Sequence, residues 1–298
     1  MHISLRAYVD LLRLHFFFAW PLLFCSGYLL ATSQYGDFSW LNLVKAALVG
    51  FFGFEAGFVL NDYIDREFDK KDIERDRLTR YWRLFGSRPI PAGYITPRAA
   101  LILFFILALI AALLIVSFPF PHSLYVLIIM AVSYLLEAFY QVKKRKEVFP
   151  VAQLVGRIDF ALFPVAGYLI AGSPDTTALL YLLFFYPFAM AHLGVNDLID
   201  VSNDQSRKLN TITTLYGLKS TASWIFAFTL IHAVFAVIFM TRLGWIGRAG
   251  LLSGLVLLSV ANGVIMKQKS PDAALKVLPL FHVTMLVYAA SIAIDSVL

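Results

Sequence analysis

The sequence has few charged residues and a single cysteine. Charged side chains make up 15% of the 298 residues, whereas a soluble globular domain carries roughly 25%. The one cysteine, Cys25, excludes an intrachain disulfide and a cysteine-based metal cluster. No low-complexity tract and no long linker interrupts the chain. We therefore expect a single domain over residues 1–298.

Hydrophobic residues, by contrast, make up 60% of the chain, and the mean hydropathy is +0.75. Many of them form apolar runs of about 20 residues, the length that crosses a bilayer as a helix. Backbone groups in lipid must bond within their own helix or within a closed barrel, and the alternating signature of barrel strands is absent. The sequence predicts an all-α polytopic membrane protein with about nine transmembrane helices, at residues 14–33, 41–61, 99–117, 122–140, 149–171, 177–196, 220–241, 246–266 and 273–294.

Lysine and arginine are distributed unevenly between the two sides of this arrangement. With nine spans, 22 of the 25 basic residues fall on the side that carries the N-terminus and the two long loops, 62–98 and 197–219. The positive-inside rule places that side in the cytoplasm of a cell-membrane protein and the C-terminus outside. The net charge of +6 is explained by this topology, so we expect no nucleic-acid partner.

A nine-residue pattern occurs twice in the chain. Residues 61–69 read NDYIDREFD and residues 196–204 read NDLIDVSND, so both fit N-D-x-x-D-x-x-x-D. Four predicted spans separate the two copies, and an even number puts both on the same side of the membrane. The repeat suggests two like-oriented halves, at about residues 1–140 and 141–298, related by an axis along the membrane normal.

The spacing of the repeat brings its polar side chains onto one helix face. Residues four apart on a helix share a face, and residues three apart border it. Carboxylates gathered in this way repel one another unless cations intervene, and oxygen-only ligands suit Mg²⁺, which also shares phosphate oxygens. We therefore predict two metal-binding clusters that face a common diphosphate, formed by Asn61, Asp62, Asp65, Asp69, Asn196, Asp197, Asp200 and Asp204.

These motifs resemble those of the UbiA superfamily of intramembrane prenyltransferases. The first copy matches the family's N-D-x-x-D-x-x-x-D signature, and Asp200 and Asp204 match its D-x-x-x-D signature. The stretch 140–143 is similar to the family's Tyr-x-x-Lys element, and 88–93 is similar to its R-P-L-P-x-G segment; 208–217 matches a further K-x-T…G stretch loosely. The resemblance implies a helical bundle around a central cavity, in which Mg²⁺, expected as two ions, bridges both acidic motifs and a prenyl diphosphate.

The resemblance also implies roles for individual residues. Asp65, Asp200 and Lys143 are the expected catalytic residues, and the diphosphate is expected to contact Tyr140, Lys143, Arg88 and Arg66. Lys144 lies about 100° further around a helix, so we expect Lys143 to reach the acidic clusters and Lys144 to point elsewhere. For Arg88 the alternative is a structural role in its loop, and for Arg66 it is pairing with Glu67 or Asp69.

The predicted activity is Mg²⁺-dependent transfer of a prenyl group from its diphosphate to an aromatic or lipid acceptor, with release of diphosphate. An ion- or substrate-coupled transporter that uses the acidic motifs as ion sites is the alternative. Two intramembrane ionisable residues, Glu55 and His192, either act on an acceptor proton or are satisfied polar groups between helices. The acceptor stays open between an aromatic acid, a quinone precursor, a tetrapyrrole and a glycerol ether lipid.

Overall fold

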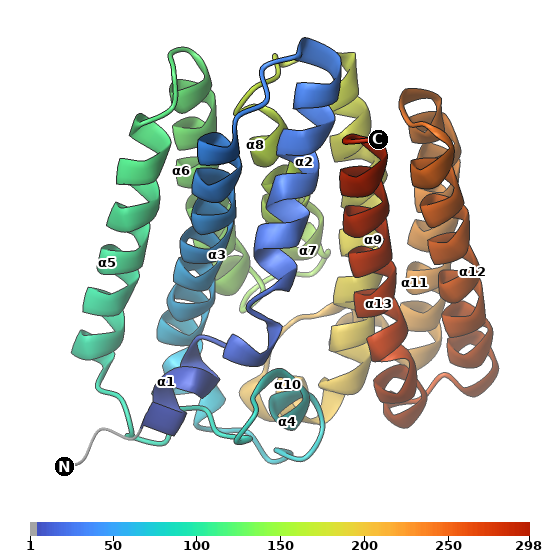
Figure 1. Ribbon diagram of the computed structural model, residues 1–298. Helices are drawn as coiled ribbons and strands as arrows, with labels where there is room; N and C mark the ends of the chain where they lie inside the picture. The colour runs from blue at the N-terminus through green and yellow to red at the C-terminus, as the bar shows by residue number, and fades with distance from the viewer. Residues whose placement is uncertain (1–4) are drawn as a thin grey trace.

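The computed structural model describes residues 5–298, and that part of the chain is helical, without strands. Long helices are joined by short helical segments and loops (Figure 1). In chain order the elements are α1 (Leu5–Leu11), η1 (Leu14–Phe16), α2 (Ala19–Tyr35), α3 (Trp40–Asp69), α4 (Leu78–Trp82), α5 (Pro97–Val116), α6 (His122–Lys143), α7 (Val151–Gly156), α8 (Ile158–Tyr168), α9 (Thr176–Ile199), α10 (Val201–Arg207), α11 (Ile212–Phe239), η2 (Met240–Arg242), α12 (Trp245–Gln268) and α13 (Pro271–Asp295).

Within the described residues, eight helical segments are long and apolar enough to cross a membrane. They correspond to eight of the nine expected spans. The ninth span was expected as a continuous helix at 149–171. That prediction was wrong, because the segment consists of two short helices, α7 and α8, with a break at Arg157. Arg157 has ψ near 1°, and its side chain is held by ion pairs with Glu137 and Asp159.

Capping residues account for where several helices begin. The Thr96 side chain accepts a hydrogen bond from the Ala99 amide, and Pro97 occupies the first turn of α5. Ser270 and Pro271 repeat this arrangement at α13. A hydroxyl at the N-cap satisfies an amide that the helix leaves free, and proline in the first turn loses no helical hydrogen bond. These starts therefore follow from local sequence.

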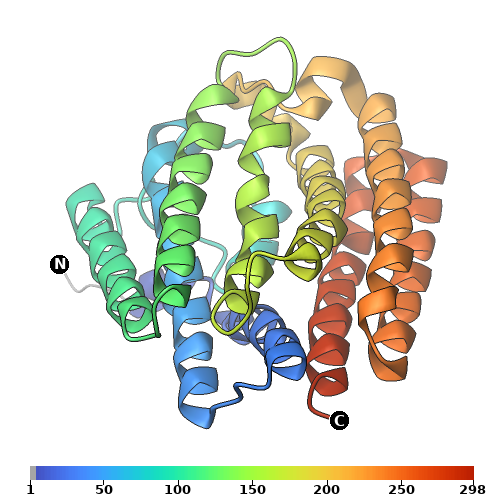
Figure 2. The same cartoon turned by 90° about the horizontal axis from the view of Figure 1, so that it is seen from above.

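Figures 1 and 2 show the long helices packed side by side around a common centre. α2 packs on α3, α8 and α13, and α9 packs on α8, α11 and α13. The C-terminus and α1 lie at opposite ends of the bundle (Figure 1). The C-terminal ends of α3 and α9, with α4 and α10, lie at the α1 end, so both copies of the acidic pattern lie at the same end of the bundle, as expected.

The broken segment packs closely against α2 through two glycines. A Cβ built on Gly27 would lie 2.0 Å from the Pro164 carbonyl oxygen, and one built on Gly167 would lie 1.9 Å from the Phe24 carbonyl oxygen. Small residues allow helix backbones to approach in this way inside membranes. Because the obstructing atoms belong to the backbone, a rotamer change cannot relieve the clash.

We predict that Gly27→Ala destabilises the protein by about 1–3 kcal/mol, the usual cost of overpacking. Gly263→Ala on α12 is the matched control, because nothing lies within 4 Å of its added Cβ, and alanine favours a helix by up to about 1 kcal/mol over glycine. Thermal unfolding in detergent, followed by tryptophan fluorescence, should show a lower Tm for Gly27→Ala only. Equal Tm values for the two variants would contradict the close α2–α8 contact.

Candidate functional site

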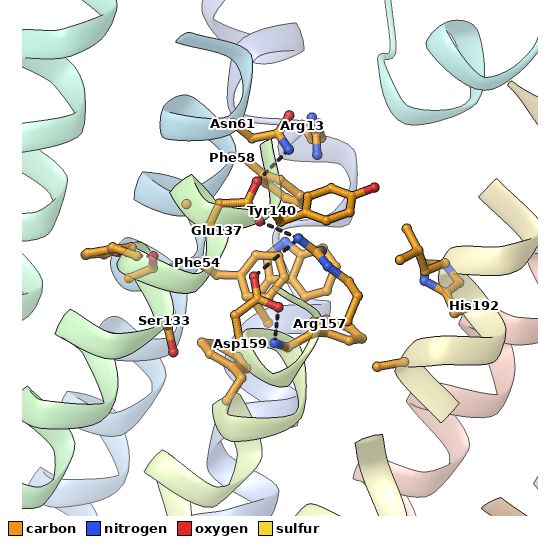
Figure 3. A pocket seen from close by; sticks show the side chains of 18 of the residues that line it. Arg13, Phe54, Phe58, Asn61, Ser133, Glu137, Tyr140, Arg157, Asp159 and His192 are labelled. Atoms are coloured by element: carbon orange, nitrogen blue, oxygen red, sulfur yellow. Dashed lines mark hydrogen bonds and ion pairs between the residues drawn. The ribbon is translucent and has the colours of Figure 1, made fainter. Parts of the chain in front are cut away.

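A cavity of about 300 Å³ opens inside the bundle, at the level where α3 and α9 carry the acidic motifs. Its apolar part is rich in aromatic side chains, among them Phe54, Phe58 and Phe163. Ionisable side chains gather in the rest of it (Figure 3). They comprise four carboxylates, Asp65, Asp69, Glu137 and Asp159, and six cations, Arg13, Arg83, Arg88, Lys144, Arg157 and Arg207. The excess of cations favours an anionic ligand.

One arginine joins the two acidic motifs, and a second binds the first motif alone. Arg207, on α10, lies 3.4 Å from Asp69 of the first motif and 3.5 Å from Asp200 of the second, and it also contacts Asp204 at 3.8 Å. Arg88 donates to Asp69 at 2.6 Å. The motifs are 135 residues apart in sequence, yet carboxylates of both contact Arg207. Their service of a common metal and diphosphate site stays a prediction.

The loop after α3 adds a further carboxylate to this cluster. Asp72 lies 2.8 Å from Arg88 and is also ion-paired with Arg207. Burial raises the pKa of Asp72, and the two arginines oppose that rise. The arginines therefore hold the loop and both motifs together.

Three side chains of the first motif, Asn61, Asp65 and Asp69, line the cavity, and Asp62 does not. Asn61 donates to Glu137 at 2.7 Å and lines the cavity. Asp65 also lines it and accepts from the amine of Lys144 at 2.6 Å. Asp62 instead faces away from the other carboxylates of its motif, toward two arginines, as described below.

In the second motif, two oxygens are buried without a partner among the described residues. Asn196 Oδ1 and Asp197 Oδ2 have no hydrogen bond. Burial raises the pKa of Asp204 well above its usual range, and the negative charges of Asp200 and Asp197 raise it further. Unpartnered carboxylate oxygens in mutual repulsion are stabilised by a cation.

The donor set fits Mg²⁺ bound jointly by protein and phosphate oxygens. Across residues 5–298, no three acidic, histidine or cysteine side chains converge closely enough to hold an ion by themselves. Mg²⁺ sites on phosphate substrates commonly use only one or two carboxylates, with phosphate oxygens and water completing the shell. The unpartnered oxygens of Asn196 and Asp197 are suitable ligands of this kind.

The expectation for the two lysines after Tyr140 was wrong. Lys144 is buried, lines the cavity and binds Asp65, whereas Lys143 is exposed and lies outside the lining. Helix phase explains the reversal, because Lys144 follows Glu137 by seven residues and Tyr140 by four, and these positions share a face. Tyr140 is placed as predicted, with the Lys144 amine 4.8 Å from its ring centroid.

Of the other predicted basic ligands, Arg88 lines the cavity and Arg66 does not. Arg66 donates to the Tyr63 carbonyl at 2.5 Å and lies 3.8 Å from Glu67. Arg66 therefore pairs with Glu67, which was the alternative to a diphosphate contact. Arg88 both lines the cavity and binds Asp69 of the first motif.

Sequence reasoning missed a polar network that is bonded to the first acidic motif. Glu137 on α6, which accepts from Asn61, lies 2.5 Å from Arg157, which in turn lies 3.3 Å from Asp159; Figure 3 shows these side chains together in the pocket. Glu137 carried an unused signal, since it is an ionisable residue within an apolar span.

The chain was then compared with known proteins. A model described as "UbiA prenyltransferase family" matches residues 18–286. The chain is 24% identical over 228 residues to a digeranylgeranylglyceryl phosphate synthase from Sulfolobus acidocaldarius, covering 75% of this chain and 74% of that protein. It is 26% identical over 216 residues to a protoheme IX farnesyltransferase from Baumannia cicadellinicola (72% and 70% covered) and 28% identical over 198 residues to a 4-hydroxybenzoate octaprenyltransferase from Tolumonas auensis (66% and 63% covered).

Solved structures share the fold at low sequence identity. A UbiA homolog from Aeropyrum pernix K1 superposes with a TM-score of 0.76 at 17% identity, over 94% of this chain and 98% of that one. A UbiA homolog from Archaeoglobus fulgidus, bound to DMAPP and Mg²⁺, superposes with a TM-score of 0.72 at 14% identity, over 96% and 98%.

The position of Asp62 leads to a prediction about stability. Asp62 accepts from Arg83 at 2.7 Å and from Arg13 at 3.0 Å, and both Asp62 and Arg83 are buried. Asp62→Ala leaves buried arginine charge uncompensated, so we expect a loss of about 3–5 kcal/mol. Asp62→Ala and Arg83→Ala should each lower the Tm in detergent, and the double variant should lose less than the sum of the two. Additive effects would contradict a direct pair.

Proposed function

Because the chain belongs to the UbiA prenyltransferase family, a family of membrane enzymes, we propose that it transfers a prenyl group from a Mg²⁺-bound prenyl diphosphate to an aromatic or lipid acceptor inside the cavity. The observation that carries this proposal is the convergence of both acidic motifs with cavity-lining cations at one end of an aromatic-lined cavity. Family membership also favours the enzyme over the transporter alternative.

The polar end of the cavity suits the diphosphate. Lys144, Arg88 and Arg207 all line it, and each contacts a carboxylate of the acidic motifs or of the adjoining loop. Asn196 and Asp197 would hold the magnesium through the oxygens that lack partners, together with Asp69, whose oxygens pair with Arg88 and Arg207. When bound, Mg²⁺ withdraws charge from the diphosphate and makes it a better leaving group. The UbiA homolog from Archaeoglobus fulgidus binds Mg²⁺ together with DMAPP.

The apolar part of the cavity suits the prenyl chain. Burial of each CH₂ contributes about 0.8 kcal/mol, and the surrounding helices exclude water, which would otherwise trap an allylic cation. The rings of Phe58 and Phe160 line the same space and present faces that stabilise positive charge. As the allylic C–O bond breaks, the arginines and Lys144 stabilise the charge that grows on the leaving diphosphate.

The long loops that carry the acidic motifs, with the N-terminus, are proposed to face the cytoplasm, since they contain most of the lysine and arginine. The broken α7–α8 segment is proposed to complete a ninth crossing. The positions of α1 and the C-terminus at opposite ends of the bundle (Figure 1) support an odd number of crossings.

Product analysis tests the proposed activity. We expect the purified protein, given geranyl, farnesyl or geranylgeranyl diphosphate with Mg²⁺, to prenylate at least one of 4-hydroxybenzoate, geranylgeranylglyceryl phosphate and protohaem IX, the chemistries suggested by the relatives' names. Mass spectrometry identifies the product, and EDTA should abolish it. Magnesium-independent transfer, or no product from any pair, would overturn the proposal.

The two neighbouring lysines provide a matched pair for the diphosphate site. We predict that Lys144→Ala lowers kcat/KM for the prenyl diphosphate by at least about tenfold, because a charge-assisted hydrogen bond is worth about 1.5–3 kcal/mol. Lys143→Ala removes an exposed charge nearby and should have little effect. Steady-state kinetics at saturating acceptor measure both. A larger effect at Lys143 would contradict the assignment.

A further inference from the structure

Transfer to a hydroxyl or an aromatic carbon releases a proton, and the cavity must accept it. The lining carboxylates are poor candidates, since each is held by cations: Asp65 by Lys144, Asp69 by Arg88, and Glu137 and Asp159 by Arg157. Among the described residues that line the cavity, two histidines, His192 and His282, lack such a partner.

The two histidines are linked to a tyrosine in the loop after α3. His192 Nε2 lies 3.0 Å from His282 Nε2, and His282 Nδ1 lies 2.6 Å from the Tyr81 hydroxyl. These contacts connect α9, α13 and α4. Both ring nitrogens of His282 are therefore occupied, whereas within residues 5–298 His192 Nδ1 has no hydrogen-bond partner.

The position of His192 suits contact with an acceptor. It lies four residues before Asn196 on α9 and so on the same helix face, about 6 Å along the axis from the acidic motif. It is only half-buried although α9 is in the middle of the bundle, because its ring borders the cavity. Figure 3 shows it projecting from α9 on the other side of the pocket from Glu137.

We propose that His192 accepts the acceptor's proton and passes it through His282 to Tyr81. This proposal rests on the proposed function. The allylic C–O bond breaks with its electron pair leaving on the diphosphate, and an electron pair of the acceptor forms the new bond to that carbon. The acceptor's proton moves to His192 Nδ1, the Nε2 proton of His192 moves to His282 Nε2, and the Nδ1 proton of His282 moves to the Tyr81 oxygen.

The Tyr81 hydroxyl in turn releases its own proton to water. Tyr81 is only half-buried and lies on α4, in the loop outside the spans. Both imidazoles end the step neutral, so no unpaired cation is left in the dry interior, where it would be costly. His192 is the catalytic residue of this relay, and His282 and Tyr81 position it and carry the proton onward.

The relay also constrains the acceptor. A base that receives a proton is useful when the nucleophile loses one on substitution, as an alcohol or a phenolic ring does. The site is therefore assigned to an acceptor that bears a hydroxyl, either on an aromatic ring or on a glycerol derivative.

Kinetics of conservative variants test the relay with geranylgeranyl diphosphate, Mg²⁺ and, as probes, 4-hydroxybenzoate and geranylgeranylglyceryl phosphate. His192→Gln keeps an amide able to bond His282 but cannot pass a proton, so kcat should fall about 100-fold or more, with the KM for the diphosphate unchanged. Tyr81→Phe should lower kcat about tenfold. His122→Gln is the control, since His122 bonds the Leu169 carbonyl and does not line the cavity.

Chemical rescue separates proton transfer from packing. Imidazole added to His192→Ala should restore part of the lost kcat, whereas a merely structural histidine would not be replaced in this way. Near-normal kcat for His192→Gln, or no rescue of His192→Ala despite a wild-type Tm, would overturn the relay while leaving the transferase activity established. Failure of the wild-type protein to prenylate either probe would overturn the hydroxyl acceptor and the relay together.

Discussion

The site depends on neutralising a group of carboxylates buried at the ends of two helices. Asp69, Asp72, Asp200 and Asp204 all contact Arg207, a single side chain on α10. Without opposite charge these groups would repel one another in a medium of low dielectric, where unpaired charge is expensive. The arginines therefore hold α3, the loop after it and α10 in one arrangement, and the rest of the site is built on that contact.

The same charges explain how a diphosphate can be admitted. Arg88 and Lys144 each contact a carboxylate and also line the cavity, so they are within reach of a ligand that enters there. An incoming diphosphate with magnesium brings both anionic oxygens for these cations and metal charge for the carboxylates. Such an exchange would pair the charges of the ligand with those of the cavity, and unpaired charge beside an apolar cavity is costly.

Much of this could be predicted from the sequence, and the failures have definite physical causes. Apolar runs predicted the spans, and the even number of spans between the two acidic motifs placed both at one end of the bundle. The break at Arg157 could not be predicted, because it depends on partners in α6 and α8.

The assignment of Lys143 rather than Lys144 to the site failed because a motif match was preferred to helix phase. Glu137, Tyr140, Gln141 and Lys144 form one stripe with spacings of three and four, and all four line the cavity. The two pseudo-halves stay a prediction.

The central claim is that both acidic motifs serve one magnesium-dependent diphosphate site. Titration calorimetry with the non-cleavable analogue geranyl thiolodiphosphate, with and without Mg²⁺, measures this for the wild-type protein, Asp65→Ala and Asp200→Ala. The account predicts one site per chain in the wild type, tighter binding with Mg²⁺, and loss of that Mg²⁺ dependence in each variant, although the substitutions lie in different halves of the sequence. Full Mg²⁺-dependent tightening in either variant would contradict it.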